Sequence, residues 1–499
     1  MYSLRTSRRY CNGRRAVTIQ TGRQRGLMTM QLINLSRNDP YPLVDQIVAG
    51  IRNQLDAREL RPGSRLPSIR AFAQAHGISR FTVVEAYDRL VAMGYLQSRR
   101  GAGFFATSPS GQGRATEAPH AHRRNEEMVW LIRRLLEAKE GTAMAGSPWL
   151  PSSWLDEPNI RRTLRSLSGR PGGHILEYGN PYGYVPLREW IAEVLLSDIG
   201  VNTTASQILL TTGTSQALDL VIRRMLVPGD TVLVDDPGYY NLFGNLRMSG
   251  VRLVGVTRTP DGPDPEALEA LAAEHRPKLY FTQSVLQNPT GTNTAPHVAY
   301  RILQSASRHD FKVVEDDIFS DLEAEKVSRL AALDQLERVI YVRSFSKTLS
   351  GSLRVGFIAC APAMIDELAD TKMLTGITSS LFSEKLIHHL LADGHYRKLL
   401  VRLRERLVSA RCRVERAFED NGIEVFCPAT SSMFLWGRFD GVEDSLPLAE
   451  QALSKGLLLA PGTVFRPNLQ PSAWLRFNVA VCCDAIVQRL LKSLARGAA

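Results

Sequence analysis

Apolar residues near the start of the chain recur at the spacing of one face of an α-helix. They are Leu43, Ile47, Ile51 and Leu55. Two shorter helical segments follow, with Ser68 and Ser79 as expected N-caps and Gly77 and Gly94 as expected ends, because these residue types satisfy or terminate free helix ends. A tight turn between two helices predicts a helix-turn-helix. The residues of its second helix that we expect in the core are Val84, Ala86 and Leu90.

Beyond residue 94, two short apolar runs flank a small turn at 99–101, which predicts a β-wing. Residues 107–127 lack a hydrophobic period and are interpreted as linker, whereas Met128–Lys139 has the pattern of an amphipathic helix. From about Asn202, short apolar runs alternate with helical patterns, which predicts βαβ units and a mostly parallel sheet. The runs are Ile208–Thr211, Thr231–Val234, Leu253–Val256, Leu279–Phe281, Val313–Val314, Val339–Val342 and Val355–Ala359.

Composition narrows the class of protein. The chain has 499 residues, of which 44% are hydrophobic and 22% charged, as in globular proteins of two or three folding units. It contains no run of 18 apolar residues, so we expect no membrane span. The six cysteines are scattered without a Cys-X-X-Cys pair, and His388-His389 has no second ligand cluster. We therefore expect no disulfide framework and no metal site, and a reducing cytoplasm fits best.

The net charge of +11 is concentrated at one end of the chain. Residues 1–106 contain 17 Arg, no Lys and 6 acidic residues, whereas the remainder carries 44 charges of each sign. A basic block beside a neutral body favours a module for a polyanion, most often nucleic acid, with a solvated basic face as the alternative. We expect residues 1–30 to be a disordered basic tail, and Met28 and Met30 are alternative starts.

Polar clusters follow several predicted strands, and in open α/β sheets binding sites form at the carboxyl ends of strands. Thr212–Gln216 opens a helix, where free N–H groups and the helix dipole favour a phosphate. Asn288–Gly291, Glu315–Asp317 and Ser344–Lys347 follow later strands. Each cluster alone is a weak signal, since a Gly-Thr-Ser turn is commonly a helix cap and a lone lysine is commonly solvated. Their joint occurrence in this order is far more specific.

This order resembles the fold-type-I aminotransferases, which bind pyridoxal 5′-phosphate. The resemblance implies that Lys347 forms a Schiff base with the cofactor aldehyde and that Asp316 keeps the pyridine nitrogen protonated. Ser344 and Arg354 flank Lys347 at the family's spacing for phosphate. Arg476 aligns with the arginine that grips an amino acid's α-carboxylate. The other implied cofactor contacts are Thr214 and Ser215 at the phosphate, Tyr239 on the ring, Asn288 at the phenolic oxygen, and Tyr178 across a dimer interface.

One position departs from the aminotransferase pattern. Three residues after Asp316 the family often has a tyrosine that donates to the phenolic oxygen, but here Phe319 occupies that position and Ile318 the other usual location. A phenyl ring cannot donate a hydrogen bond, so we expect an altered titration of the bound cofactor. We therefore expect the body to bind the cofactor without acting as a multi-turnover enzyme.

Residues 40–106 resemble the winged helix of the GntR regulators. The signature lies in Arg61–Arg70, in Gly77–Val83 and in the wing Gly94–Gly103. The resemblance implies that the recognition helix begins at Ser79 and that Arg80 pairs with a guanine. The other residues expected at DNA are Arg65, Arg70, Ser79, Thr82, Arg100 and Gly101. A protein-binding winged helix is the alternative for this region alone.

A winged helix, a linker and an aminotransferase-like body in this order resemble the MocR-type subgroup of the GntR regulators. The expected α/β architecture has a tail at 1–30, a winged helix-turn-helix domain at 31–107, a linker at 108–145 and a fold-type-I domain at 146–499. That last domain should combine a large, mostly parallel sheet with a smaller C-terminal α/β subdomain. The resemblance implies a homodimer in the bacterial cytoplasm, associated with the nucleoid when it binds operator DNA. Its body would sense pyridoxal phosphate, an amino acid or an amine.

Two other interpretations stay open. The first is a working pyridoxal-phosphate-dependent aminotransferase that carries the winged helix as a passenger, against which Phe319 and the basic N-terminal block argue. The second is a cofactor-free regulator whose body only dimerises.

Overall fold

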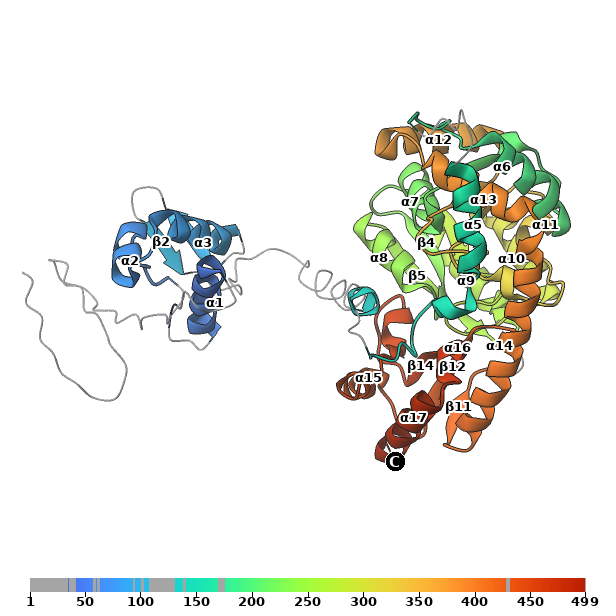
Figure 1. Cartoon of the computed structure of the whole chain (residues 1–499). Coiled ribbons are helices and arrows are strands. Elements are labelled where there is room, and N and C mark those ends of the chain that lie inside the picture. Colours follow the sequence, from blue (N-terminus) through green and yellow to red (C-terminus); the bar gives the residue numbers. More distant parts are fainter. Residues whose placement is uncertain are drawn as a thin grey trace, which may run out of the picture. The chain divides into compact units, whose positions relative to one another are not determined.

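The computed structural model describes residues 35, 42–56, 60, 63–92, 95–99, 103–106, 131–137, 141–168, 176–427 and 431–498. The chain divides into two compact units, Met1–Glu117 and Ala118–Ala499, of which the first is drawn in blue and the second in the remaining colours of Figure 1. The basic tail expected at residues 1–30 lies outside the described residues, as do Arg100 and Gly101 of the expected wing.

The N-terminal unit combines a helix-turn-helix with a two-stranded sheet. Its described elements are α1 (Leu43–Asp56), α2 (Ile69–His76), α3 (Arg80–Ala92), β1 (Leu96–Arg99) and β2 (Gly103–Ala106). The Ser68 side chain caps α2 by accepting the N–H of Ala71 at 3.2 Å, and Gly77 ends α2 in the left-handed conformation. The strands pair antiparallel with Leu96 opposite Ala106, so the predicted wing is present.

The core of this unit confirms most of the expected hydrophobic face. Ile47 and Ile51 of α1 are fully buried, and α3 contributes its own set of buried side chains. That set is Val83, Ala86, Tyr87 and Leu90. The expectation for Val84 was wrong, because residues 83, 86, 87 and 90 fall on one arc of the helix and Val84 lies half-buried at its edge.

The body contains an eight-stranded sheet in the order β3-β10-β9-β8-β7-β4-β5-β6. Its strands are β3 (Ile208–Thr211), β4 (Thr231–Asp236), β5 (Arg252–Thr259), β6 (Gly262–Pro263), β7 (Leu279–Thr282), β8 (Lys312–Asp316), β9 (Val339–Ser344) and β10 (Gly356–Ala359). The central run β5-β4-β7-β8-β9 is parallel, and β10 is antiparallel to both of its neighbours. The predicted mostly parallel sheet is confirmed.

Helices cover both faces of this sheet (Figure 1). Alternate strand residues enter two different hydrophobic clusters, as with Leu209 and Leu210 of β3 or Phe357 and Ile358 of β10. The cluster on one face is completed by α7 (Gly213–Met225), α8 (Tyr240–Met248) and α12 (Pro362–Gly376). The cluster on the other face is completed by α6 (Val185–Trp190), α9 (Pro265–His275), α10 (Pro296–His309), α11 (Leu330–Asp334), α13 (Leu381–Ala392) and α14 (His395–Glu419).

A smaller antiparallel sheet, in the order β11-β12-β14-β13, forms the C-terminal α/β subdomain. Its strands are β11 (Ile423–Val425), β12 (Phe434–Phe439), β13 (Ala460–Pro461) and β14 (Trp474–Asn478). The helices of this region are α15 (Ser445–Ser454), α16 (Val479–Cys482) and α17 (Ala485–Ala498). The remaining elements of the body are η1 (Ser152–Trp154), α5 (Glu157–Ser168), η2 (Ile191–Leu196), η3 (Ala205–Gln207), η4 (Ser320–Leu322) and η5 (Gly462–Phe465).

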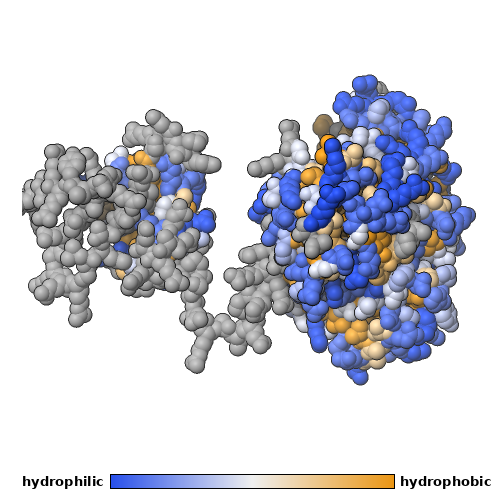
Figure 2. Space-filling view, turned by 90° about the horizontal axis from the view of Figure 1, so that it is seen from below, coloured by the Kyte–Doolittle hydropathy of each residue, from blue (hydrophilic) through white to orange (hydrophobic). Residues whose placement is uncertain are grey.

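The end of the segment interpreted as linker packs on the body. Leu131 and Leu135 are buried in the same hydrophobic cluster as α7 and α12, and Ala143 forms a parallel bridge with Leu457. On the face that Figure 2 shows, hydrophilic residues cover much of the body and hydrophobic residues reach the surface in separate patches.

Candidate cofactor site and DNA-binding face

The carboxyl ends of the parallel strands gather the polar side chains that the sequence indicated. β8 ends at Asp316, β9 ends at Ser344 shortly before Lys347, and β4 ends shortly before Tyr239. Since β4, β7, β8 and β9 are neighbours in one parallel array, these ends share one edge of the sheet. A hollow at this edge is lined by Tyr239, Gln283 and Asp316, among others.

Lys347 presents a half-buried amine at this edge. Its Nζ donates to the carbonyl oxygen of Pro148 at 2.7 Å and lies 5.5 Å from the centre of the Phe319 ring. Burial and the nearby Arg476 guanidinium lower the pKa of Lys347 to about 7, although the Asp316 carboxylate acts in the opposite direction. A large share of the amine is therefore uncharged near neutral pH, which is the form that attacks a carbonyl carbon.

Asp316 provides a buried carboxylate, and only one of its two oxygens accepts a hydrogen bond from a described residue. Its Oδ2 accepts from Nε2 of Gln283 at 2.8 Å, whereas Oδ1 has no hydrogen-bond partner among the described residues. Burial raises the pKa of Asp316 to about 7, while the Gln283 hydrogen bond lowers it and the neighbouring Asp317 raises it. A buried acceptor without a donor calls for a proton-bearing group such as a protonated ring nitrogen.

The start of α7 forms a cradle beside Arg354. The Arg354 guanidinium donates to the carbonyl oxygen of Thr212 and to Oγ of Ser346, each at 3.3 Å. The Ser344 hydroxyl lies 2.8 Å from the Ser346 hydroxyl. Gly213 has a φ of 74°, and a Cβ built on it would lie 2.6 Å from the Arg354 guanidinium, so only glycine fits there without displacing the cation. Free helix N–H groups, hydroxyls and a cation suit a phosphate.

Arg476 is fully buried on β14 and already engaged. It donates to Oδ1 of Asn288 at 2.7 Å and to the carbonyl oxygen of Gly146 at 2.6 Å. Its guanidinium lies 4.9 Å from the ring centres of both Phe434 and Phe465. Because the amide oxygen of Asn288 accepts from Arg476, its NH₂ group is left as the donor end of the side chain.

The other expected cofactor residues differ in their exposure. Thr214 is buried and Ser215 is exposed in the first turn of α7, while Tyr178 is 79% exposed. Sequence reasoning missed Gln283, although it directly follows β7 and so satisfies the same strand-end rule. It also missed Ser346, whose hydroxyl links Ser344 and Arg354.

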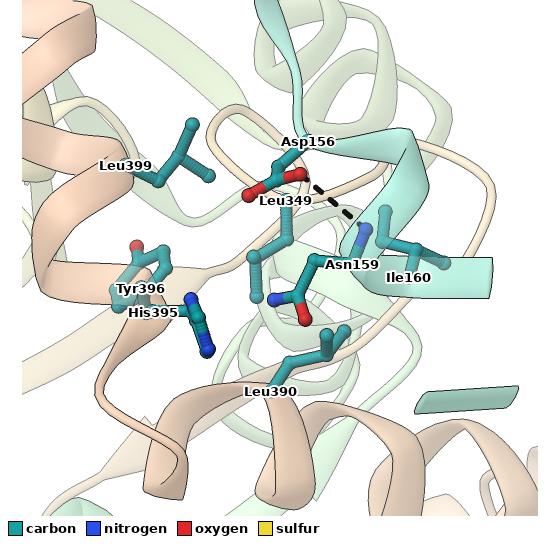
Figure 3. Close-up of a pocket in the computed structure, with 8 residues that line it drawn as sticks. All are labelled: Asp156, Asn159, Ile160, Leu349, Leu390, His395, Tyr396 and Leu399. Carbon is teal, nitrogen blue, oxygen red and sulfur yellow. Dashed lines mark hydrogen bonds between the residues drawn. The ribbon is translucent and has the colours of Figure 1, made fainter. Parts of the chain in front are cut away.

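Thr348, which directly follows Lys347, takes part in a second set of hydrogen bonds. The Tyr396 hydroxyl lies 2.8 Å from Oγ1 of Thr348 and donates to Asp321 at 2.6 Å. Figure 3 shows the adjoining pocket, where residues at the start of α14 face residues at the start of α5. It is lined by Asp156, Asn159, Ile160, Leu349, Leu390, His395, Tyr396 and Leu399. None of the expected cofactor contacts lines this pocket.

Over the described residues, no group of three or more His, Cys, Asp or Glu side chains could hold a metal ion. Nor does that part of the chain contain a helix long and apolar enough to cross a membrane.

The expected DNA contacts of the N-terminal unit lie on exposed surface. Arg65, Arg70 and Arg80 are exposed, and Thr82 is partly buried. Arg65 lies beside the wing, because its backbone bridges to β2 and a Cβ on Gly103 would lie 3.5 Å from its Nε. The Ser79 hydroxyl accepts the N–H of Phe81 at 3.2 Å, so it caps α3 as expected and keeps its own proton free to donate.

Comparison with known proteins first defines the class. Residues 159–494 match the family described as aminotransferase class I and II, and residues 43–106 match the bacterial regulatory proteins of the gntR family. The crystal structure of LysN, an α-aminoadipate aminotransferase from Thermus thermophilus complexed with N-(5′-phosphopyridoxyl)-L-leucine, superposes with a TM-score of 0.69 at 26% identity. The match covers 76% of this chain and 97% of that one. The body thus has the fold-type-I aminotransferase architecture, whose cofactor is pyridoxal 5′-phosphate.

Full-length relatives then define the subgroup. The chain is 31% identical over 414 residues to the probable rhizopine catabolism regulatory protein MocR of Rhizobium meliloti, covering 77% of this chain and 78% of MocR. It is 27% identical over 434 residues to the uncharacterized HTH-type transcriptional regulator YdfD of Bacillus subtilis, covering 85% and 90%. The chain belongs to the MocR-type subgroup of the GntR transcription regulators.

The residues present fit the cofactor of this family. Asp316 has a buried oxygen without a donor, Lys347 has a half-buried amine of lowered pKa, and the glycine at 213 opens the start of α7 beside Arg354. These three features correspond to the ring nitrogen, the aldehyde and the phosphate of pyridoxal 5′-phosphate.

Proposed function

We propose that this regulator binds pyridoxal 5′-phosphate on Lys347 and that its affinity for operator DNA changes when an amino compound occupies the same site. The observation that carries the proposal is that the half-buried amine of Lys347 and the unpartnered Oδ1 of Asp316 lie at one edge of the sheet. We place the protein in the bacterial cytoplasm, on the nucleoid when DNA is bound, because its proposed partner is double-stranded DNA.

When bound, the cofactor supplies an aldehyde carbon that amines attack and a ring that accepts electrons. Lys347 presents its uncharged amine, and Asp316 holds a proton at the ring nitrogen. Thr214, Ser215, Ser344 and Arg354 hold the phosphate, Tyr239 packs on the ring, and Asn288 donates to the phenolic oxygen. Arg476 binds the carboxylate of an amino acid effector, because its planar guanidinium can donate two parallel hydrogen bonds.

Lys347 and Arg476 also connect the site to the segment that follows the predicted linker. Lys347 donates to the carbonyl of Pro148, and Arg476 donates to the carbonyl of Gly146. Both acceptors lie in the segment directly after the predicted linker at 108–145. A ligand that takes over these donors removes two hydrogen bonds from that segment and favours a different arrangement of it. Hydrogen exchange of residues 141–150 should therefore increase on ligand binding, and unchanged exchange would exclude this route.

The cofactor step is tested by visible absorption of the full-length protein after incubation with pyridoxal 5′-phosphate, followed by borohydride reduction and peptide mass mapping. We expect a visible chromophore and a label on the peptide that contains Lys347. Lys347→Ala should lose both, while Lys398→Ala, which changes an exposed lysine of α14, should keep both. A colourless wild-type protein would leave only the interpretation in which the body dimerises without cofactor.

The sensing step is tested by measuring operator affinity of the cofactor-loaded protein with a panel of amino acids and amines. At least one compound should change the affinity, and Arg476→Lys should weaken the response to carboxylate-bearing compounds more than to plain amines. Operator affinity that ignores every compound and the cofactor itself would refute the sensing role.

We further propose that the protein is a homodimer through an apolar surface of the body. Leu176, Tyr178, Leu374 and Ile377 are 101%, 79%, 89% and 56% exposed. Their segments adjoin one another, because Nζ of Lys372 donates to the carbonyl oxygen of Pro181 and to Oγ of Ser379. Large exposed apolar side chains on adjoining segments favour a protein interface. In such a dimer, Tyr178 would reach the partner's phosphate.

Sedimentation of Leu374→Arg tests the dimer. The variant should shift toward monomer and lose cofactor affinity in parallel, because Tyr178 would no longer meet the partner's site. A monomeric wild-type protein would refute this part of the proposal.

A working aminotransferase is the second candidate function, and the intact set of Lys347, Asp316 and Arg476 favours it. Multi-turnover conversion of an amino donor with a keto acceptor would support it. Against it stands Phe319, which is buried edge-to-face against Phe434 at 5.1 Å and offers no hydrogen bond to the cofactor.

A further inference from the structure

The outward face of α3 carries an aromatic side chain that the fold does not use. Phe81 is 86% exposed, and no other large hydrophobic side chain in the described part of residues 42–106 is classed as exposed. The buried arc of α3 is formed by residues 83, 86, 87 and 90. At 100° per residue, Phe81 points almost directly away from that arc. Full exposure forgoes most of the free energy that burying a phenyl ring provides.

The place of Phe81 on the helix indicates what covers it. It is the second residue of α3, directly after Arg80, and its N–H is capped by the Ser79 hydroxyl at 3.2 Å. The N-terminal residues of a recognition helix are those that meet base edges when the helix enters the major groove. There the C5-methyl group of thymine is the apolar feature that a side chain can contact.

The neighbouring residues are compatible with a nucleic acid as the occupant. Val84 lies half-buried one turn further along and, together with Phe81, forms the apolar part of a shallow hollow on α3, whose other lining residues are Glu85, Asp88 and Arg89. The acidic Glu85 is paired with Arg89 at 2.8 Å, and Arg89 is also paired with Asp45 at 2.9 Å. Arg89 therefore partly compensates the charges of Glu85 and Asp45, Asp88 adds a further acidic side chain at the hollow, and Arg80 directly precedes the ring. Residues 1–106 as a whole hold 17 Arg against 6 acidic residues.

We propose that Phe81, with Val84 at its side, reads a thymine methyl group in each half-site of the operator, next to the base that Arg80 contacts. The inference rests on the proposed DNA-binding function and adds to it a specific base preference. A methyl group is apolar and is best contacted by an apolar side chain such as Phe81. The polar Arg80 and the polar groups that contact phosphates do not suit this contact.

The test is a cycle between protein and DNA variants. Operator fragments are first selected from genomic DNA with the full-length protein, and each thymine of a half-site is then replaced by uracil, which lacks only the methyl group. Wild-type affinity should fall about fourfold at one position per half-site, the effect of one buried methyl group. Phe81→Ala should bind the thymine operator more weakly and lose the discrimination between thymine and uracil at that position alone. Phe81→Leu should restore part of it.

Met248→Ala is the matched control, because it truncates an apolar side chain that is 82% exposed on α8 of the body. It should keep the full thymine preference. If wild-type protein binds no DNA, the proposed function itself fails. If it binds DNA but wild type and Phe81→Ala respond equally to every uracil, the thymine contact is refuted while the proposed function stands. If Phe81→Ala keeps operator binding unchanged and instead loses a protein partner, the ring serves protein docking and the inference is overturned.

Discussion

The two units of this chain place their proposed functional residues in opposite environments. In the N-terminal unit, Arg80 and Phe81 are exposed on one helix, and the roles that we propose for them depend on identity and position alone. In the body, Asp316 and Arg476 are buried and Lys347 is half-buried, and their properties depend on partners far away in sequence. Surface changes should therefore alter recognition with little effect on folding, whereas changes in the buried site should alter stability and function together.

The largest expected effect of this difference is on the stability of the cofactor-free body. Burial raises the pKa of Asp316 from its usual 3.8 to about 7, so between these values the folded state holds a proton that the unfolded chain releases. The stability of the wild type consequently falls as pH rises from about 4 to 7, and the penalty is complete above 7. Three pKa units correspond to at most about 4 kcal/mol. Asp316→Asn should remove this penalty.

Thermal unfolding of cofactor-free protein at pH 5 and pH 8 measures this effect. Asp316→Asn should raise the Tm clearly at pH 8 and much less at pH 5. The same variant should bind pyridoxal 5′-phosphate roughly 10- to 100-fold more weakly, because one charge-assisted hydrogen bond is lost. An equal gain in Tm at both pH values would show that the carboxylate charge is not the cause.

Gly213→Ala should separate backbone strain from the loss of a cation contact. Gly213 has a φ of 74°, and the added Cβ would press on the Arg354 guanidinium at 2.6 Å. Left-handed backbone costs a non-glycine residue about 1–2 kcal/mol. Gly229→Ala is the matched control, since its φ of 94° imposes comparable strain with no atom within 4 Å of the new Cβ. Only Gly213→Ala should also weaken cofactor binding, and equal cofactor affinities would argue against Arg354 as a phosphate ligand.

On the exposed side, Arg80→Ala should reduce operator affinity by about 1–3 kcal/mol and relax the base preference at one position. Arg70→Ala should instead weaken binding to all sequences alike and lower the salt dependence by about one charge. Both side chains are exposed, so neither variant should change the Tm. Fluorescence anisotropy at several salt concentrations distinguishes the two patterns. A uniform loss in Arg80→Ala would reassign that residue to the phosphate backbone.

The difference between the units also explains what the sequence could predict. β3 is observed as Ile208–Thr211, as expected, because a strand covered on both faces reads as an uninterrupted apolar run. β5 extends beyond its expected run to Thr259, because Arg258 is buried in an ion pair with Asp235 at 2.9 Å, and a hydrophobic pattern cannot reveal such a partner. On α3, the expected buried face was displaced by one residue: Val84 was expected in the core, but Val83 is the valine that is fully buried.

For the site, the rule that polar residues gather at the carboxyl ends of parallel strands predicted Lys347, Asp316 and Asn288 at one edge of the sheet. This rule depends only on the topology of the sheet, which the sequence pattern indicates. The bonds from Lys347 to Pro148 and from Arg476 to Gly146 could not be foreseen, since they join residues 199 and 330 positions apart. Those are the contacts that link the site to the segment after the linker. The residues of the site could therefore be predicted from the sequence, whereas the hydrogen bonds that connect them to residues 146 and 148 could not.

Phe319→Tyr should produce the smallest effect of these variants. It tests whether the missing hydrogen-bond donor at position 319 changes the protonation of the bound cofactor, as expected for a site that does not support multi-turnover catalysis. Phe319 is 3% exposed, and its ring centre lies 5.5 Å from Nζ of Lys347. A tyrosine hydroxyl there would donate to the cofactor's phenolic oxygen, which weakens the hold of that oxygen on its shared proton. The pKa read from the visible spectrum of the bound cofactor should therefore fall, by about one unit for a single hydrogen bond. Phe319→Leu, which removes the ring without adding a donor, should leave that pKa nearly unchanged. If the tyrosine and leucine variants titrate alike, the missing donor at this position does not set the state of the cofactor.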